Sequence, residues 1–236
     1  MINTAELLSN FERDGYLVIE NFFDDKLMVT LDRLILEHYG DEPEFLHNDE
    51  FLGKAQTDVI PWFPRNEGVA AFKTIEEDSR LDELTSAILG DGWASQYCMV
   101  MFSKRGTTGQ AWHQDCSPDR PDVFNLNRLV YTRDITDEIG GQTVVVPGSY
   151  REGLLPTGEP LGKLGNQVVL RPKKGTLILL HGHTWHRVLP ITGAHRFSIN
   201  YRSAPSGTPH DVTDDCVYRN MRYRFSTSEV IEERII

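Results

Sequence analysis

The chain has 236 residues, of which 39% are hydrophobic and 25% are charged, and its formal net charge at pH 7 is −11. This length is enough to bury a sizeable core, while the acidic balance and the lack of any Lys or Arg block argue against a nucleic-acid or membrane surface. A small molecule is therefore the expected partner, and the oligomeric state stays open.

The N-terminal part predicts three helices and one strand. A short first helix carries an apolar stripe, and Gly15 releases the chain into an aliphatic strand at 16–19. Apolar residues recur at helical spacing over 26–39 and again near 77–89, and a glycine follows each of these segments. These helices are expected to cover the outside of the fold.

Residues 41–68 lie between the second and third predicted helices. They combine three prolines with four Phe or Trp residues and show no sustained period, which predicts a long loop. Because such loops often close over a site, we predict a lid. The alternative is that Trp62 and Phe63 only fasten the loop to the body of the protein.

After Trp93 the sequence changes to short β-rich runs separated by Gly and Pro turns, which predicts a sandwich or barrel. The runs are 95–104, 124–134, 142–147, 167–170, 175–181, 186–190 and 195–203. Because the helices precede the strands, the expected fold is mainly β with flanking helices, a jelly roll of the cupin-like kind. We expect one domain over 1–236, with a helical cover over about 1–92, the jelly-roll core over about 93–204 and a C-terminal extension at 205–236.

The cysteines and the aliphatic runs predict the cellular location. Cys98, Cys116 and Cys216 form no CxxC pair, and an odd number without a signal peptide is typical of reduced thiols. The longest aliphatic runs are far too short to span a bilayer. A soluble, cytoplasmic protein is expected.

The strongest chemical motif is the Trp-His-Gln-Asp segment at 112–115. If the segment is extended, His113 and Asp115 project from the same face and can bind one metal ion together. A further imidazole would complete two histidines and one carboxylate, the set that leaves open positions on non-haem Fe(II). A later cluster offers three candidates between which spacing alone does not decide, namely His181, His183 and His186. The competing interpretation is a structural hydrogen-bonded His-Asp pair.

Residues 196–201 alternate polar with apolar side chains, so Arg196, Ser198 and Asn200 share one face of the predicted strand. If that face lines the cavity, the guanidinium needs an anionic partner, because an unpaired buried charge is costly. A carboxylate co-substrate would supply one. The alternative is a solvent-facing strand with an ordinary surface ion pair. Thr143, on a strand flanked by glycines, has a hydroxyl that can bond the same ligand or a neighbouring strand.

Together these motifs resemble the phytanoyl-CoA dioxygenase family of Fe(II)- and 2-oxoglutarate-dependent oxygenases, over most of the chain. Residues 11–19 look like the family's N-terminal opening, 112–115 like its HxD motif and 141–149 like its strand ending in Pro-Gly-Ser. Gly140 stands where the family usually has Asn. The family fold is a double-stranded β-helix, which agrees with the expected jelly roll.

The resemblance implies a ligand set of His113, Asp115 and His186, because the family's distal histidine precedes the co-substrate arginine by about ten residues (196 − 186 = 10). By the same resemblance, Arg196 and Ser198 hold the far carboxylate of 2-oxoglutarate, with assistance from a hydroxyl at position 143.

The implied reaction is hydroxylation of an unactivated C–H bond of a small molecule, which consumes O2 and 2-oxoglutarate and releases succinate and CO2. The presence of Asp115 favours hydroxylation over halogenation, while desaturation, ring closure and epimerisation stay open. The primary substrate is not indicated, and its candidate pocket walls are Gln110, Asn127, Trp62 and Trp185. The rival interpretations are a cupin-type metalloenzyme that does not use 2-oxoglutarate and a catalytically inactive jelly roll that binds a ligand.

Overall fold

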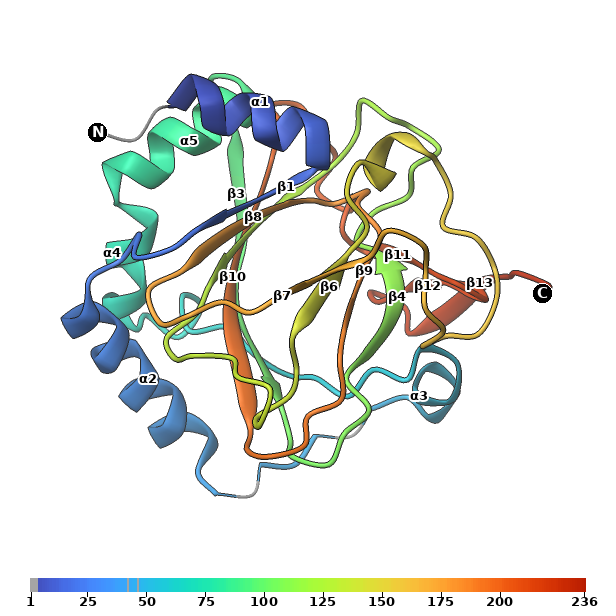
Figure 1. Ribbon diagram of the computed structural model, residues 1–236, viewed down its shortest axis with the longest axis horizontal. Helices are drawn as coiled ribbons and strands as arrows, with labels where there is room; N and C mark the ends of the chain where they lie inside the picture. Colours follow the sequence, from blue (N-terminus) through green and yellow to red (C-terminus); the bar gives the residue numbers. More distant parts are fainter. Residues whose placement is uncertain (1–3, 42, 46) are drawn as a thin grey trace.

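Two antiparallel β-sheets face each other and form the body of the protein (Figure 1). The structure, a computed structural model, describes all residues except 1–3, 42 and 46. The six-stranded sheet has the order β1 (Tyr16–Ile19), β8 (Leu177–His181), β5 (Leu126–Val130), β10 (Arg196–Ala204), β3 (Ala94–Ser103) and β2 (Ile60–Trp62). The seven-stranded sheet has the order β13 (Glu229–Glu233), β12 (Met221–Arg224), β11 (Asp215–Tyr218), β4 (Gln110–Gln114), β9 (His186–Val188), β6 (Thr143–Val145) and β7 (Val168–Leu170). The predicted jelly roll is confirmed.

Helices cover the outer face of the six-stranded sheet, on one side of the molecule in Figure 1. They are α1 (Thr4–Asp14), α2 (Asp25–Tyr39), α4 (Lys73–Glu76) and α5 (Ser79–Leu89), and a 3-10 turn, η1 (Ala70–Phe72), leads into α4. Leu31, Ile35 and Leu81 on these helices are fully buried in one core with Phe102 and Phe197 of the sheet. A second 3-10 turn, η2 (Ser149–Arg151), follows β6.

The predicted helices begin and end where capping groups are available. Asp24 accepts a hydrogen bond from the backbone N–H of Leu27 (2.9 Å) at the start of α2. Gly40 (φ 63°) follows the last residue of α2 in a conformation that favours glycine. Asp78 caps α5 in the same way as Asp24 caps α2. Both helices therefore agree with the sequence prediction to within two residues.

Strand β10 separates the helical core from the interior of the jelly roll. Phe197, Ile199 and Tyr201 belong to the core under the helices. Arg196 and Asn200 face the opposite way and line a cavity between the sheets. The predicted division of this strand into an apolar and a polar face is confirmed, and the polar face does not meet solvent.

The structure differs from the prediction at 41–68, which is not a continuous loop. The segment contains helix α3 (Asp49–Ala55), capped by Asn48, and strand β2, which pairs with β3. A proline is compatible with β2 because that strand lies at the sheet edge, where one of its sides needs no ladder hydrogen bonds. Positions 42 and 46 of the predicted lid lie outside the described residues.

The segment 205–236, predicted as a C-terminal extension, forms part of the seven-stranded sheet. Its three strands continue the seven-stranded sheet, because β11 pairs with β4 and places Tyr218 opposite His113. Phe51 of α3 packs against Tyr218 and Tyr223, which joins the N-terminal and C-terminal segments beside this sheet. Strands β11, β12 and β13 were not predicted because each is short and carries charged residues.

None of the helices in the described part of the chain has the length and apolar character needed to cross a bilayer.

Candidate metal centre

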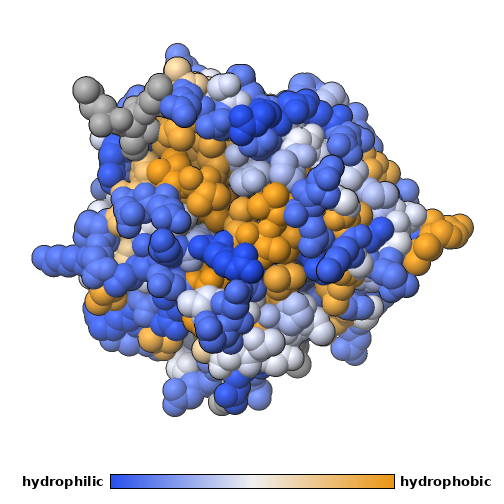
Figure 2. Space-filling model, in the orientation of Figure 1, coloured by the Kyte–Doolittle hydropathy of each residue, from blue (hydrophilic) through white to orange (hydrophobic). Residues whose placement is uncertain are grey.

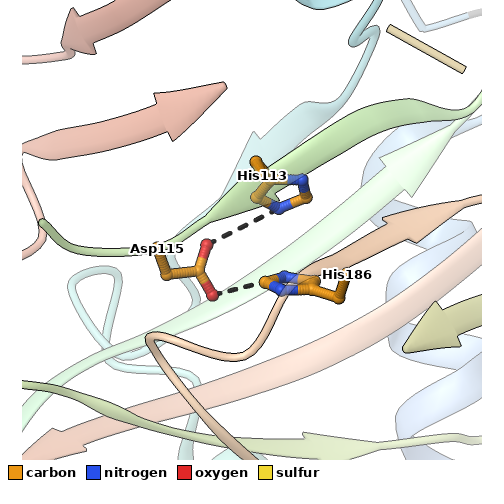
Figure 3. A group of neighbouring side chains, drawn as sticks. All are labelled: His113, Asp115 and His186. Atoms are coloured by element: carbon orange, nitrogen blue, oxygen red, sulfur yellow. Dashed lines mark ion pairs between the residues drawn. The ribbon is translucent and has the colours of Figure 1, made fainter. Parts of the chain in front are cut away.

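His113, Asp115 and His186 meet in the interior of the jelly roll (Figure 3). His113 lies on β4 and His186 at the start of β9, and these two residues are directly paired across the two strands. Asp115 follows β4 by one residue. Their candidate ligand atoms all lie within 4.8 Å of one another, and Asp115 Oδ1 and Oδ2 are 3.6 and 3.5 Å from Nε2 of His113 and His186. The strand pairing thus brings the HxD motif and one histidine of the later cluster together.

Both imidazoles are oriented by the same backbone contact. Nδ1 of His113 lies 2.8 Å from the carbonyl of Ala111, and Nδ1 of His186 lies 2.8 Å from the carbonyl of Thr184. A carbonyl oxygen can only accept, so each Nδ1 carries a proton, and Nε2 of the neutral ring presents a lone pair toward Asp115. This tautomer is the one that a metal bound through Nε2 requires.

The protonation states also suit a metal. Burial and the neighbouring His186 lower the pKa of His113 to about 3, against the opposing effect of Asp115, so its imidazole is neutral. Burial raises the pKa of Asp115, but Arg202 and the two imidazoles lower it by more. The pKa of Asp115 therefore lies well below its ordinary value. Metal ligands must be deprotonated, so a neutral His113 imidazole and an ionised Asp115 carboxylate fit a divalent iron ion.

The other members of the histidine cluster lie elsewhere. His181 stacks on Phe124 (ring centroids 4.2 Å apart), and its Nδ1 accepts a hydrogen bond from the backbone N–H of His183. Among the described residues, neither joins the group that surrounds Asp115.

Arg196 is a buried cation on the same cavity. Its side chain is 2% exposed, and no carboxylate of the described residues forms an ion pair with it. Nη1 donates to Ser198 Oγ (3.0 Å), whereas Nε has no hydrogen-bond partner in the described part of the chain. Burial lowers the pKa of Arg196. A carboxylate ligand in the cavity would offset the free-energy cost of burying this charge and supply the missing hydrogen-bond acceptor.

The surroundings of Arg196 include a residue that the sequence did not suggest. The guanidinium carbon lies 5.8 Å from the ring centroid of Tyr131, whose hydroxyl is 3.1 Å from Thr143 Oγ1. Gly141 (φ 71°) packs against the arginine stem, since a Cβ at this position would stand 2.9 Å from Arg196 Cγ. Tyr131 follows a buried strand, but no local motif marks it as a neighbour of a co-substrate.

The metal group and Arg196 open on one cavity of about 840 Å³. Gln110 and Asn127 line it, as predicted, but Asn127 is 1% exposed and its amide donates to Asp115 Oδ2 (2.6 Å). Asn127 therefore contacts a candidate metal ligand as well as the cavity. Residues of 41–68 and 205–236 form the outer wall, including Phe45, Phe51, Phe63, His47, His210, Asp214 and Phe225.

The structure places the two predicted tryptophans outside the cavity lining. Trp62 is 5% exposed and stacks on His38, while its neighbours Pro61 and Phe63 face the cavity. Trp185 packs on the outer face of the seven-stranded sheet and donates to the carbonyl of Gly153 (3.3 Å). Alternation explains both cases, because each is adjacent in the chain to a residue that points into the cavity. Neither tryptophan lines the cavity, and both pack in hydrophobic clusters.

Comparison with known proteins identifies the family of this chain. The model of the family described as phytanoyl-CoA dioxygenase (PhyH) matches residues 11–197. Ectoine dioxygenase of Stutzerimonas stutzeri (strain A1501) is 26% identical over 217 residues, which cover 86% of this chain and 67% of that protein.

Solved structures share the fold at low sequence identity. HygX from Streptomyces hygroscopicus, crystallised with nickel and 2-oxoglutarate, is 14% identical with a TM-score of 0.67 and 88% coverage of both chains. The non-haem α-ketoglutarate-dependent epimerase SnoN from nogalamycin biosynthesis is 18% identical, also with a TM-score of 0.67, and the match covers 92% of this chain and 85% of SnoN. Because the family match extends over most of the sequence, this chain belongs to the phytanoyl-CoA dioxygenase (PhyH) family.

Proposed function

We propose that this Fe(II)- and 2-oxoglutarate-dependent dioxygenase binds iron through His113, Asp115 and His186 and hydroxylates a C–H bond of a small molecule. The observation that carries the proposal is the meeting of this triad with the buried Arg196 on one cavity. A metalloenzyme that did not use 2-oxoglutarate would have no need for a buried guanidinium without a carboxylate partner. The arginine therefore favours 2-oxoglutarate over the cupin-type alternative.

Each residue has a definite task in this reaction. Bound Fe(II), together with 2-oxoglutarate and O2, supplies the oxidising chemistry; one oxygen atom goes to the substrate and the other to succinate, with release of CO2. The backbone carbonyls of Ala111 and Thr184 hold both imidazoles with Nε2 toward the metal. Arg196, supported by Ser198, holds the far carboxylate of 2-oxoglutarate and so orients its keto-acid end toward the triad. The surrounding walls restrict the access of water.

The cavity walls support a substrate without phosphate groups. Of the described residues, Arg196 and Arg202 are the only Lys or Arg side chains that line the cavity, and Arg202 is paired with Asp115 (3.1 Å). The outer wall is instead mostly aromatic, and Asp214 adds a carboxylate to it. A CoA ester would bring several phosphate charges that nothing on this wall neutralises. We therefore infer a small organic substrate that is uncharged or cationic, which agrees with the ectoine and hygromycin B named for the relatives.

A cytoplasmic location is part of this proposal. It is supported by the three cysteines, all of which are free and buried.

The direct test is succinate formation. Purified protein supplied with Fe(II), O2 and 2-oxoglutarate should produce succinate, and the rate should fall to background in Asp115→Ala. Coenzyme A at millimolar concentration should leave both this rate and the thermal midpoint unchanged. Production of succinate at the wild-type rate by Asp115→Ala would refute the metal assignment, and stabilisation by coenzyme A would refute the substrate class.

A further inference from the structure

Two buried polar side chains, Asn127 and Arg202, contact the Asp115 carboxylate. We propose that Arg202 and Asn127 are positioning residues that fix the Asp115 carboxylate so that it binds the metal through Oδ1 alone. This inference rests on the proposed metal site, but it concerns residues that the ligand motif does not include.

The orientation of the Asn127 amide follows from its neighbours. Its Oδ1 accepts hydrogen bonds from Asn200 Nδ2 (2.8 Å) and Arg202 Nε (2.8 Å). Both of these groups can only donate, so the oxygen must face them and the amide nitrogen must face the other way. That nitrogen donates to Asp115 Oδ2 at 2.6 Å. Asn127 therefore transmits the positions of two β10 side chains to the candidate metal ligand.

Arg202 binds Asn127 and Asp115 with different nitrogens of one planar group. Nε contacts Asn127, and Nη2 lies 3.1 Å from Asp115 Oδ2. The guanidinium carbon lies 5.1 Å from the Tyr97 ring centroid, which supports its flat face. Arg202, Asn127 and Asp115 are 7%, 1% and 8% exposed, so bulk water offers little competition for these contacts. A lysine has a single nitrogen and lacks the planar fork that reaches Asn127 and Asp115 with separate nitrogens.

These contacts leave the two oxygens of Asp115 in different states. Oδ2 accepts the hydrogen bond from Asn127 and forms the ion pair with Arg202 Nη2, whereas neither of these two residues engages Oδ1. Oδ1 lies 3.6 Å from Nε2 of His113, which is unprotonated and cannot donate. Oδ2 lies at a similar distance from Nε2 of His186 (3.5 Å), so the two oxygens differ in their other partners and not in their closeness to a histidine. A metal held by the triad would meet Oδ1, which neither Asn127 nor Arg202 engages.

The strand geometry places Arg202 at this point. Arg202 lies on the same face of β10 as Arg196, and the register with β3 shifts immediately after it. Such irregularities often lie next to active sites, where they re-aim a side chain.

The test measures metal binding without turnover. Binding of Mn(II) is followed by electron paramagnetic resonance in the wild type, Arg202→Lys and Asn127→Ala. Loss of an outer partner of a metal ligand typically weakens binding by about 10- to 100-fold, which is the loss we expect in both variants. At saturating Fe(II) and 2-oxoglutarate, the charge-transfer absorbance band of both variants should also shift, because the freed carboxylate meets the metal differently.

Arg128→Lys is the matched control. Arg128 is a fully buried arginine next to Asn127 on β5, but its Nε donates to the carbonyl of Tyr201 (2.9 Å) on the helical side of the sheet. This variant should lower the thermal midpoint and leave Mn(II) affinity and the band unchanged. If Asn127→Ala does not fold, Asn127→Ser takes its place.

The outcomes separate the inference from the function on which it rests. Wild-type Mn(II) affinity and an unshifted band in the Arg202 and Asn127 variants would overturn the positioning role. An equal loss of affinity in Arg128→Lys would also overturn it, since the effect would then be general destabilisation. If the wild type bound no Mn(II), or if Asp115→Ala bound it equally well, the metal site itself would be wrong.

Discussion

Replacement of Arg196 by glutamine tests whether this residue sets the affinity for 2-oxoglutarate. In the wild type the guanidinium is 2% exposed, Nη1 is engaged by Ser198 and Nε has no partner among the described residues. The guanidinium is therefore already desolvated before a ligand binds. An incoming carboxylate forms a charge-assisted contact without a further desolvation cost for the arginine. Glutamine keeps a hydrogen-bond donor of shorter reach but removes the charge.

The magnitude follows from the burial of the pair. Loss of one partner of a buried, hydrogen-bonded charge pair costs about 2–5 kcal/mol. With about 1.4 kcal/mol per tenfold change, Arg196→Gln should weaken 2-oxoglutarate binding roughly 30- to 3000-fold. Arg196→Lys keeps the charge but not the planar fork, so its affinity should lie between the other two. Ser198→Ala removes one neutral partner and should cost only about 0.5–1.5 kcal/mol.

The assay is a titration of 2-oxoglutarate into the anaerobic Fe(II) protein, followed through the charge-transfer absorbance. Iron affinity, measured separately, should change little in Arg196→Gln because no triad atom is altered. The metal-bound variant should also gain less thermal stability from 2-oxoglutarate than the wild type does. An unchanged dissociation constant in Arg196→Gln would refute the reasoning and leave the buried guanidinium without a role.

Three further predictions follow from the same contacts. Asp115→Ala and His186→Ala should lose bound iron and succinate formation with the fold intact, whereas His183→Ala should keep both. The reverse pattern for the two histidines would mean that His183, and not His186, is the ligand. Hydrogen exchange in 41–68 should slow when substrate binds, because this segment forms part of the cavity wall; equal protection with and without substrate would argue against a lid. Burial lowers the pKa of His181 to about 3, so below pH 6.5 the unfolded chain binds a proton that the folded chain does not. The metal-free protein should therefore lose about 1 kcal/mol of unfolding free energy through this group between pH 7 and 5.5, and urea denaturation of His181→Gln should show a smaller loss.

The parts of the site that could be predicted from sequence depend on local periodicity. Two residues of the HxD motif share a face because a strand alternates, and the same rule places Arg196 and Asn200 together on β10. The choice of His186 among three histidines came from the family resemblance, and the structure places this residue next to Asp115 (3.5 Å). The ligand assignment itself stays a prediction until metal binding is measured.

The parts that could not be predicted depend on contacts between distant strands. Asn127 was expected to face substrate, and its bond to Asp115 appears only when the sheet that contains β5 faces the sheet that contains β4. Tyr131 and Arg202 carry no local signal for the same reason. In 41–68, Pro61 and the aromatic residues hid a short edge strand that pairs with β3 and is held by tertiary contacts.

Strand β10 explains how the fold can keep its chemistry constant while the substrate changes. Every residue of β10 is buried, and the strand lies between β5 and β3 in the middle of the sheet, so its position depends on the core and not on the cavity walls. Arg196 and Arg202 extend from one face of this strand, the first toward the proposed co-substrate site and the second toward Asp115. The two cations are thus fixed relative to each other by the same rigid backbone. The outer wall comes from separate segments, 41–68 and 205–236, which contribute no proposed metal or co-substrate ligand. Substitutions in the outer wall should therefore change which molecule is oxidised, whereas substitutions on the polar face of β10 should change whether oxidation occurs at all.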